Sequence, residues 1–339
     1  MIGILTAGGD CPGLNAVIRA VVHRAHQSGT SCIGIRYGWK GLMENITVPL
    51  DREVVDEIMG LGGTILGTSR QDPYVHGNGL ASISETMRTH HIEQVVVIGG
   101  EGTLASALRL SQEGLPVIGV PKTIDNDIAA TDVTFGFHTA VQIATDAIDR
   151  LTTTAESHDR VILVEVMGRH AGWIAAYAGL ASGADAILVP EVTFDVAELA
   201  RLLKRRQARG KNYSIVVVAE GAPLPAGLER PVTQRDAYGF ERLGGIANVL
   251  APAIEELSGF ETRVTVLGHV QRGGTPTAYD RILATRFGVA AADLAVAGEA
   301  GVMVALRGDA IVPVPLEEAC ARVRLLDPEI YEVAQTFFG

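Results

Sequence analysis

An acidic loop follows one of the most apolar stretches of the chain. The segment VIGVPKTIDNDIAATD, residues 117–132, begins as a strand and continues into Lys122, Asp125 and Asp127. Side chains alternate along an extended backbone, so acids two residues apart are expected to point the same way. Two converging carboxylates favour a site where a metal ion and an attacking hydroxyl meet. The alternative is a capped, solvated turn.

Two glycine-rich turns add a phosphate-binding pattern. GGDCPG at residues 8–13 and GGEGT at residues 99–103 each lie between a predicted strand and a predicted helix. Glycines let backbone amides approach a phosphate at a helix N-terminus, where the helix dipole favours negative charge. The first turn is neither a Walker A nor a GxGxxG sequence, so a plain tight turn is the alternative. Glu101 is either a Mg²⁺ ligand or a carboxylate that faces the helix dipole.

Arginines complete the charge pattern. Those in or beside predicted strand-end loops are Arg70, Arg160, Arg169, Arg263 and Arg272. Each alone is typical of a solvated surface, but together they indicate bidentate recognition of phosphate. His170 and His269 have no second His or Cys at a ligand spacing, which favours a structural or substrate-orienting role over metal binding.

Composition limits the class of protein. The 339 residues suffice for two domains, and 47% of them are hydrophobic, which predicts a sizeable core. Lys and Arg number 28 against 39 Asp and Glu, which argues against nucleic acid as the main partner. Three widely separated cysteines suit a reducing cytosol, and no apolar run has membrane-spanning length. We therefore expect a soluble cytoplasmic protein.

The elements that must position these residues follow one repeated pattern. Short Val/Ile-rich runs such as QVVVIGG, RVILVEV and SIVVVAE are each followed by a loop and then by a helical pattern, as in residues 139–151. Such runs predict parallel strands covered on both faces, and ligands in these sheets bind beyond the carboxyl ends of the strands. The fold class is α/β, with two doubly wound, Rossmann-like domains and mostly parallel sheets. Residues 222–245 are polar and rich in Pro and Gly, which predicts a long surface loop.

The sequence resembles the 6-phosphofructokinase family, in particular its actinobacterial members. The resemblance covers almost the whole chain and is carried by GGDCPGLNAVIR, GGTILGTSR, GGEGT, PKTIDND, VEVMGRHAGW, VTVLGHVQRGG and YDRILATR. It implies phosphorylation of fructose 6-phosphate at its 1-hydroxyl with Mg-ATP, a step of glycolysis. It also implies a donor domain of residues 1–138 plus about 271–305. The implied fructose 6-phosphate domain comprises residues 139–270 plus about 306–339.

Roles carry over position by position as implications of this resemblance. Asp125 resembles the catalytic base, Asp127 its partner near the metal, and Thr123 the residue that orients the phosphoryl group. Arg169 resembles the transition-state arginine. Positions matching the nucleotide and Mg²⁺ site are Gly9, Arg70, Glu101, Gly102, Thr103 and Lys122, with Glu101 as the metal ligand. Positions matching the sugar-phosphate pocket are Thr123, Asp125, Arg160, Met167, Gly168, Arg169, Glu220, Arg263, His269 and Arg272. In the family, the counterparts of Arg160 and Arg263 reach across from an adjacent subunit, which implies a homo-oligomer, usually a homotetramer.

Two positions of the sequence favour different phosphoryl donors. In the resembled family, ATP enzymes generally carry Gly at positions 102 and 122, and pyrophosphate enzymes carry Asp and Lys. This chain has Gly102 with Lys122. A carboxylate at position 102 would repel the α-phosphate of a nucleotide, whereas a cation at position 122 is compatible with both donors. We therefore expect ATP, with a pyrophosphate-dependent enzyme as the alternative.

Regulation and two rival functions stay open at this point. The basic residues of the family's effector site are retained at Arg19, Arg52 and Lys211 but replaced by His23 and Thr152, so control by ADP or phosphoenolpyruvate is left undecided. GGEGT also resembles the NAD kinase and lipid kinase superfamily, which gives no account of PKTIDND or MGRHAG. A non-catalytic sensor of nucleotide or sugar phosphate is the remaining rival, although it would be expected to lose Asp125, Asp127 or Arg169, and this chain retains all three.

Overall fold

The chain folds into two compact α/β units, and each is described here by itself. The computed structural model describes residues 1–75, 77–229 and 243–339. The first unit contains Met1–Thr139 and Arg272–Val323. The described part of the second unit contains residues 140–229, 243–271 and 324–339. The polar loop predicted over residues 222–245 lies largely outside the described residues.

The first unit is built on a mostly parallel sheet. Its elements are β1 (Ile2–Ala7), α1 (Leu14–Gln27), β2 (Cys32–Ile35), α2 (Trp39–Met43), β3 (Thr47–Leu50), α3 (Arg52–Val55), α4 (Gly79–Thr89), β4 (Gln94–Gly99), α5 (Glu101–Gln112), β5 (Val117–Thr123), β6 (Phe135–Gly136), α10 (Ala278–Ala297), β11 (Val302–Arg307), β12 (Ala310–Pro315) and α11 (Leu316–Cys320). The strand order is β12-β11-β5-β4-β1-β2-β3, with β6 beside β5. Only the outer pairs β2–β3 and β11–β12 are antiparallel among the described strands. Every residue of β1, β4 and β5 is buried, as expected for strands covered on both faces.

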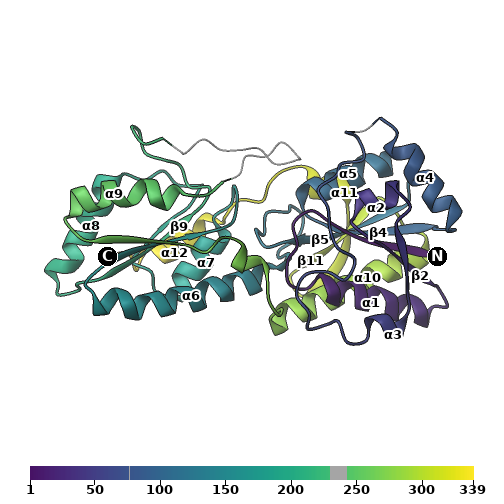
Figure 1. Cartoon of the computed structure of the whole chain (residues 1–339), viewed down its shortest axis with the longest axis horizontal. Coiled ribbons are helices and arrows are strands. Elements are labelled where there is room, and N and C mark those ends of the chain that lie inside the picture. The colour runs from purple at the N-terminus through teal and green to yellow at the C-terminus, as the bar shows by residue number, and fades with distance from the viewer. Residues whose placement is uncertain (76, 230–242) are drawn as a thin grey trace. The chain divides into compact units, whose positions relative to one another are not determined.

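Helices cover both faces of this sheet. Figure 1 shows α1 and α10, which pack on each other, on one side, and α4, α5 and α11 on the other. The buried cluster on the α5 side includes Leu104 and Leu110 of α5 against Val95 and Val97 of β4. This arrangement is the doubly wound one that the Val/Ile runs predict.

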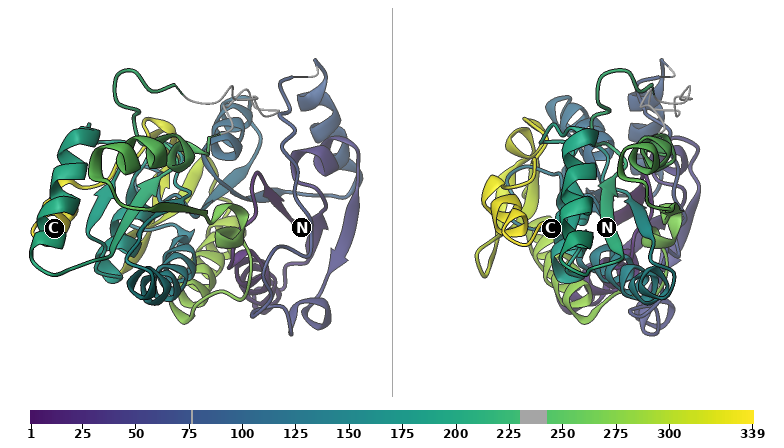
Figure 2. Two further views of the ribbon diagram at one scale, coloured as in Figure 1. Left: turned by 60° about the vertical axis from the view of Figure 1, so that its left-hand side comes forward. Right: turned by 90° about the vertical axis from the view of Figure 1, so that its left-hand side faces the viewer.

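The second unit has the same construction on a smaller sheet. Its elements are α6 (Phe137–Ser157), which begins in the first unit, β7 (Val161–Val166), α7 (Trp173–Ala181), β8 (Ala186–Leu188), α8 (Val196–Ala208), β9 (Ser214–Ala219), α9 (Ile246–Ser258), β10 (Thr262–Val266), η1 (Gly268–Arg272), which ends in the first unit, and α12 (Pro328–Gln335). The described strands run in the order β10-β7-β9-β8, all parallel. Figure 2 shows helices on both sides of this sheet as well. The predicted α/β class with two doubly wound, Rossmann-like units is confirmed.

The first unit continues past residue 306, from which the chain was expected to belong to the second unit. β11 pairs with β5, and β12 folds back on β11 in an antiparallel hairpin. Gly308, at φ 57°, turns this hairpin in a conformation that glycine adopts without strain. Residues up to Val323 therefore lie with the first unit, because β12 extends its sheet and Val314, Leu316 and Ala319 belong to its core.

Candidate active site

The acidic loop after β5 is a locked bend. Asn126 has φ 54°, a left-handed conformation that Asn tolerates better than most residues. Its Oδ1 accepts a hydrogen bond from the Thr134 backbone N at 3.0 Å, and Thr134 Oγ1 donates to the Thr123 carbonyl at 2.8 Å. The Asp125 backbone N donates to Thr123 Oγ1 at 3.0 Å. The backbone is thus not extended between Asp125 and Asp127. The alternation of side chains along a strand, on which their expected common direction was based, does not apply here.

Both carboxylates of this bend are buried. Asp125 is 4% exposed and Asp127 is 7% exposed. No described residue makes a hydrogen bond to Oδ1 of Asp125. A buried carboxylate oxygen without a partner costs free energy, so sites of this kind suit a ligand that supplies a proton donor or a cation. The solvated-turn alternative does not fit this burial.

Two cations flank the first glycine-rich turn. Lys122 is 3% exposed, and its Nζ donates to the Gly9 carbonyl. Arg272 Nη1 donates to the Asp10 carbonyl at 3.3 Å, and a Cβ built on Gly9 would lie 2.6 Å from that same nitrogen. Burial, with a smaller contribution from Arg272, lowers the pKa of Lys122 to about 8. The backbone and both cations together form a positive surface suited to phosphate.

The second glycine-rich turn starts a helix. Gly100 is the N-cap of α5 and Glu101 is its first residue, with an exposed side chain. A Cβ on Gly99 would lie 2.3 Å from the Thr103 Cβ, so the turn needs glycine there. The free backbone amides of this helix start can bind an anion.

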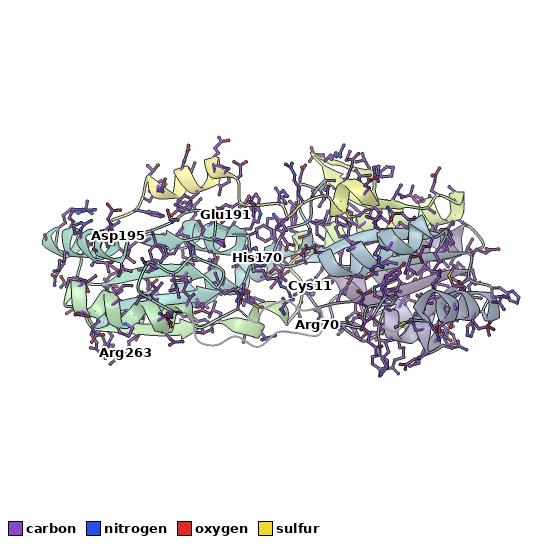
Figure 3. All side chains as sticks on the ribbon, turned by 90° about the horizontal axis from the view of Figure 1, so that it is seen from above. Cys11, Arg70, His170, Glu191, Asp195 and Arg263 are labelled. Atoms are coloured by element: carbon purple, nitrogen blue, oxygen red, sulfur yellow. The ribbon has the colours of Figure 1, made fainter. Side chains whose placement is uncertain are left out.

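Sheet order brings these three segments to one edge. β1, β4 and β5 are neighbours, with Ala7 paired to Gly99 and Gly99 paired to Pro121. The turns after β1 and β4 and the acidic bend after β5 therefore lie side by side at the carboxyl ends of the strands. Arg70 belongs to the same edge, because the Gly8 backbone N donates to the Ser69 carbonyl at 3.0 Å. Figure 3 labels Arg70 and Cys11 in this unit.

The described residues of the first unit offer Mg²⁺ few protein ligands, so phosphate and water would complete a site there. No group of three potential metal ligands occurs among the residues that the structure describes. Mg²⁺ in phosphoryl-transfer sites usually takes one or two carboxylates and fills its remaining positions with water and phosphate oxygens. The exposed Glu101 carboxylate fits the role of such a ligand. The role of Glu101 stays a prediction.

In the second unit, a strained loop follows β7. Gly168 has φ 138° and Arg169 has φ 51°, a conformation rare for a residue with a side chain. The Arg169 backbone N donates to Glu220 Oε1 at 3.2 Å. Glu220 follows β9, the neighbour of β7, and a Cβ on Gly221 would lie 1.7 Å from the Arg169 carbonyl oxygen. Met167, Gly168, Arg169 and Glu220 thus lie together, and strain of this kind is typical of functional sites.

The far side of this loop is also fixed. The Gly172 backbone N donates to both carboxylate oxygens of Glu191 at 3.0 and 3.2 Å, and the Leu326 backbone N donates to Glu191 Oε1 at 2.9 Å. The exposed His170 lies between these anchors. His269 is exposed in η1, beyond the carboxyl end of β10, which neighbours β7. These residues share one edge of the second sheet.

Arg160 and Arg263 lie at the opposite edge, which corrects their expected placement in ligand-binding strand-end loops. Arg160 immediately precedes β7, and Arg263 is the second residue of β10. Both are held there by Glu261. Arg160 precedes all six residues of β7 and Arg263 pairs with Ile162, so their backbones lie about 16 to 23 Å from Met167 along the strands. Figure 3 labels Arg263 and His170 at opposite ends of this unit.

Sequence reasoning missed Tyr37, which follows β2 at the donor edge. Its ring is 37% exposed, its φ is 59°, and the Arg36 guanidinium lies 4.9 Å from the ring centroid. Ser69 Oγ donates to the Tyr37 carbonyl at 2.6 Å, which ties this residue to the segment that carries Arg70. An aromatic residue and a glycine directly after a strand were the available signal. An exposed, fixed ring of this kind can stack on a nucleobase.

The arrangement of this sheet edge defines a class of protein. Two glycine-rich turns, the buried Lys122, the half-buried Arg272 and a buried acidic bend at one edge of a doubly wound sheet are typical of an α/β phosphotransferase. None of the described helices is both long enough and apolar enough to cross a membrane.

Comparison with known proteins gives the family. The protein-family description "Phosphofructokinase" matches residues 1–295. The chain is 55% identical over 343 residues to the ATP-dependent 6-phosphofructokinase of Mycobacterium tuberculosis, covering 100% of this chain and 99% of that protein. It is 54% identical over 341 residues, with the same coverage, to the pyrophosphate–fructose 6-phosphate 1-phosphotransferase of Amycolatopsis methanolica. This chain belongs to the phosphofructokinase family.

A solved structure supports the same conclusion. Phosphofructokinase from Pichia pastoris in the T-state superimposes with a TM-score of 0.83 at 30% sequence identity. The match covers 99% of this chain and 36% of the yeast chain, so this chain spans about a third of that longer protein.

Proposed function

We propose that this protein transfers the terminal phosphoryl group of Mg-ATP to the 1-hydroxyl of fructose 6-phosphate, as a cytoplasmic enzyme of glycolysis. The observation that carries the proposal is the buried Asp125 with its unmatched Oδ1, at the same sheet edge as two glycine-rich turns and Lys122. A carboxylate placed in this way needs a proton donor, and a sugar hydroxyl provides one.

Asp125 accepts the proton as the hydroxyl oxygen forms its bond to phosphorus and the bond from phosphorus to the bridging oxygen of the donor breaks. Thr123, whose Oγ1 accepts from the Asp125 backbone N, holds the bend in place. Proton removal by a positioned base contributes about 10²–10⁴ in rate. Most of the remaining acceleration comes from positioning and from neutralisation of charge.

Several groups neutralise the negative charge of the phosphoryl group and of the donor phosphates. Bound Mg²⁺ would supply charge neutralisation at the donor phosphates, with Glu101 as its protein ligand and Asp127 near it. Lys122 and the amides of the turn at residues 8–10 bind the donor phosphates. We assign to Arg169 the stabilisation of the phosphoryl group in the transition state, on the strength of its motif MGRHAG.

The choice between ATP and pyrophosphate depends on the residues of this chain, because relatives named for either donor are about equally similar to it. Gly102 lies in the first turn of α5, where a carboxylate would repel a nucleotide α-phosphate. The exposed Tyr37 ring at the same edge has a use with a nucleobase and none with pyrophosphate. Both features favour ATP. The buried Lys122 keeps the pyrophosphate enzyme as the second candidate.

The acceptor site requires a second copy of the chain. Met167, Glu220 and His269 lie at the carboxyl edge of the second sheet and would bind the sugar. Arg160 and Arg263 lie about 20 Å away, along the length of β7. They are too far away to bind the phosphate of the same sugar, so they serve the pocket of an adjacent subunit. A homotetramer with shared sites satisfies this geometry.

One assay tests activity and donor together. Formation of fructose 1,6-bisphosphate is followed with fructose 6-phosphate, Mg²⁺ and either ATP or pyrophosphate. We expect turnover with ATP and at most slow turnover with pyrophosphate. Preference for pyrophosphate would overturn the donor assignment, and absence of turnover with both would favour a non-catalytic sensor.

A further inference from the structure

Three charged side chains form a cluster at the amino edge of the second sheet. Arg160 Nη2 lies 2.9 Å from Glu261 Oε1, and Arg263 Nη2 contacts the same oxygen. We call Arg160 and Arg263 the arginine pair, and Glu261 is the carboxylate that contacts both. A single carboxylate oxygen therefore bridges two guanidinium groups.

Strand register explains why these residues meet. β7 and β10 are parallel neighbours, with Val161 paired to Thr262. The residues just before each strand, Arg160 and Glu261, are therefore adjacent, and the Val161 backbone N donates to the Glu261 carbonyl at 3.1 Å. Arg263 lies two positions after Glu261 along β10, so the two side chains point to the same face. The contacts follow from the backbone and need no special loop.

The cluster is accessible, and its ion pairs are exchangeable. The side chains of Arg160, Glu261 and Arg263 are 29%, 41% and 58% exposed. Exposed ion pairs are weak because water screens them. A guanidinium carries more N–H donors than these two contacts use, and no described residue accepts from the Nε of Arg160. A hydrogen bond and the nearby positive charge of Arg160 lower the pKa of the Glu261 carboxyl, which is therefore charged at neutral pH.

We propose that Glu261 is a displaceable internal anion, which occupies the arginine pair until the phosphate of the sugar substrate replaces it. The inference rests on the proposed function, in which Arg160 and Arg263 bind the 6-phosphate. Glu261 holds two like charges together in the free protein, and a phosphate dianion offers more charge and more acceptor oxygens than the carboxylate. Glu261 thus sets the affinity for sugar phosphate and favours dianions over weaker anions.

The test compares charge-neutralised variants. Glu261→Gln keeps the size of the side chain and removes its charge. We expect the KM for fructose 6-phosphate to fall threefold to tenfold with kcat unchanged, and the inhibition constant of inorganic phosphate against fructose 6-phosphate to fall in parallel. Glu256→Gln removes one charge from an exposed residue of α9 that has no ion pair among the described residues, and should leave both constants unchanged.

Further variants separate this inference from the proposed function. Arg160→Ala should raise the KM for fructose 6-phosphate; if it does not, the assignment of the arginine pair fails, whatever Glu261 does. With that assignment intact, an unchanged or raised KM in Glu261→Gln would overturn the displaceable anion, and a raised KM would make Glu261 a positioning residue. Glu261→Asp, which keeps the charge on a shorter side chain, should fall between the wild type and Glu261→Gln. Thermal unfolding confirms that each variant is folded.

Discussion

Mixed oligomers test the shared site in the most demanding way. One variant carries Asp125→Ala and so lacks the proposed base. The other carries Arg160→Ala and Arg263→Ala and so lacks the proposed phosphate anchor of its neighbour. Assayed at low fructose 6-phosphate, each variant alone should be nearly inactive, because every site in a uniform oligomer has the same defect.

The expected recovery follows from the separation along β7. A hexose phosphate spans at most about 10 Å, whereas the arginine pair and Met167 are about 20 Å apart in one chain. The proposed acceptor site therefore needs residues from two subunits. With random pairing, about half of the pairs are mixed, and in each mixed pair one site carries both defects and the other carries none. A mixture of equal parts, refolded together, should regain about a quarter of wild-type activity.

A matched control and a clear refutation accompany this experiment. Asp125→Ala mixed with Asp127→Ala should regain nothing, because each site takes its acidic bend from one subunit and every bend carries one of the two defects. The activity is measured as fructose 1,6-bisphosphate formed per subunit, after size-exclusion chromatography shows intact oligomers. If the mixture of Asp125→Ala with the double arginine variant shows only the sum of the activities of its two parents, the site is not shared between subunits.

Three further predictions concern the donor site and the thiols. Gly102→Asp should lower kcat/KM for ATP by roughly 10²–10³, since two like charges at 4 Å and a dielectric of 20 repel by about 4 kcal/mol; undiminished kcat/KM in steady-state kinetics would refute this. Because burial lowers the pKa of Lys122 to about 8, its charge is present below that pH and lost above it, so kcat/KM for ATP should fall as pH rises through about 8. A pH profile of Lys122→Arg, which stays charged, should lack that fall. Burial raises the thiol pKa of Cys11, of Cys32 to about 12 and of Cys320 to about 11, so the native protein should react slowly with a disulfide reagent at pH 7 and fast once unfolded; rapid native reaction would contradict this burial.

Much of the fold was predictable because burial on both faces leaves a plain signal. Strands such as Val95–Ile98 need apolar residues at every position, and glycine-rich turns mark where each one ends. The β11–β12 hairpin was harder to assign to a unit. The first five residues of β11 are all apolar, but they give no sign of which sheet the strand joins.

The candidate site divides in the same way. Lys122, Asp125 and the turns around Gly9 and Gly102 were found because their residue types and strand-end positions coincide. Tyr37 was missed, since its proposed contact with a nucleobase depends on exposure and a positive φ that sequence does not show.

The amino-edge position of Arg160 and Arg263 was also missed. It depends on strand register, and so does their contact with Glu261. Resemblance to a family suggests the role of each residue. The strand register and the ion pairs show in addition that Glu261 of the same chain occupies the arginine pair.

The central claim is that Asp125 removes the proton from the sugar hydroxyl. Asp125→Asn keeps the shape of the bend and removes the base, so kcat with ATP should fall by at least about 10², while the dissociation constant of fructose 6-phosphate, measured by calorimetry, stays within about threefold. A kcat within about tenfold of wild type would contradict the claim, since a general base contributes more than that.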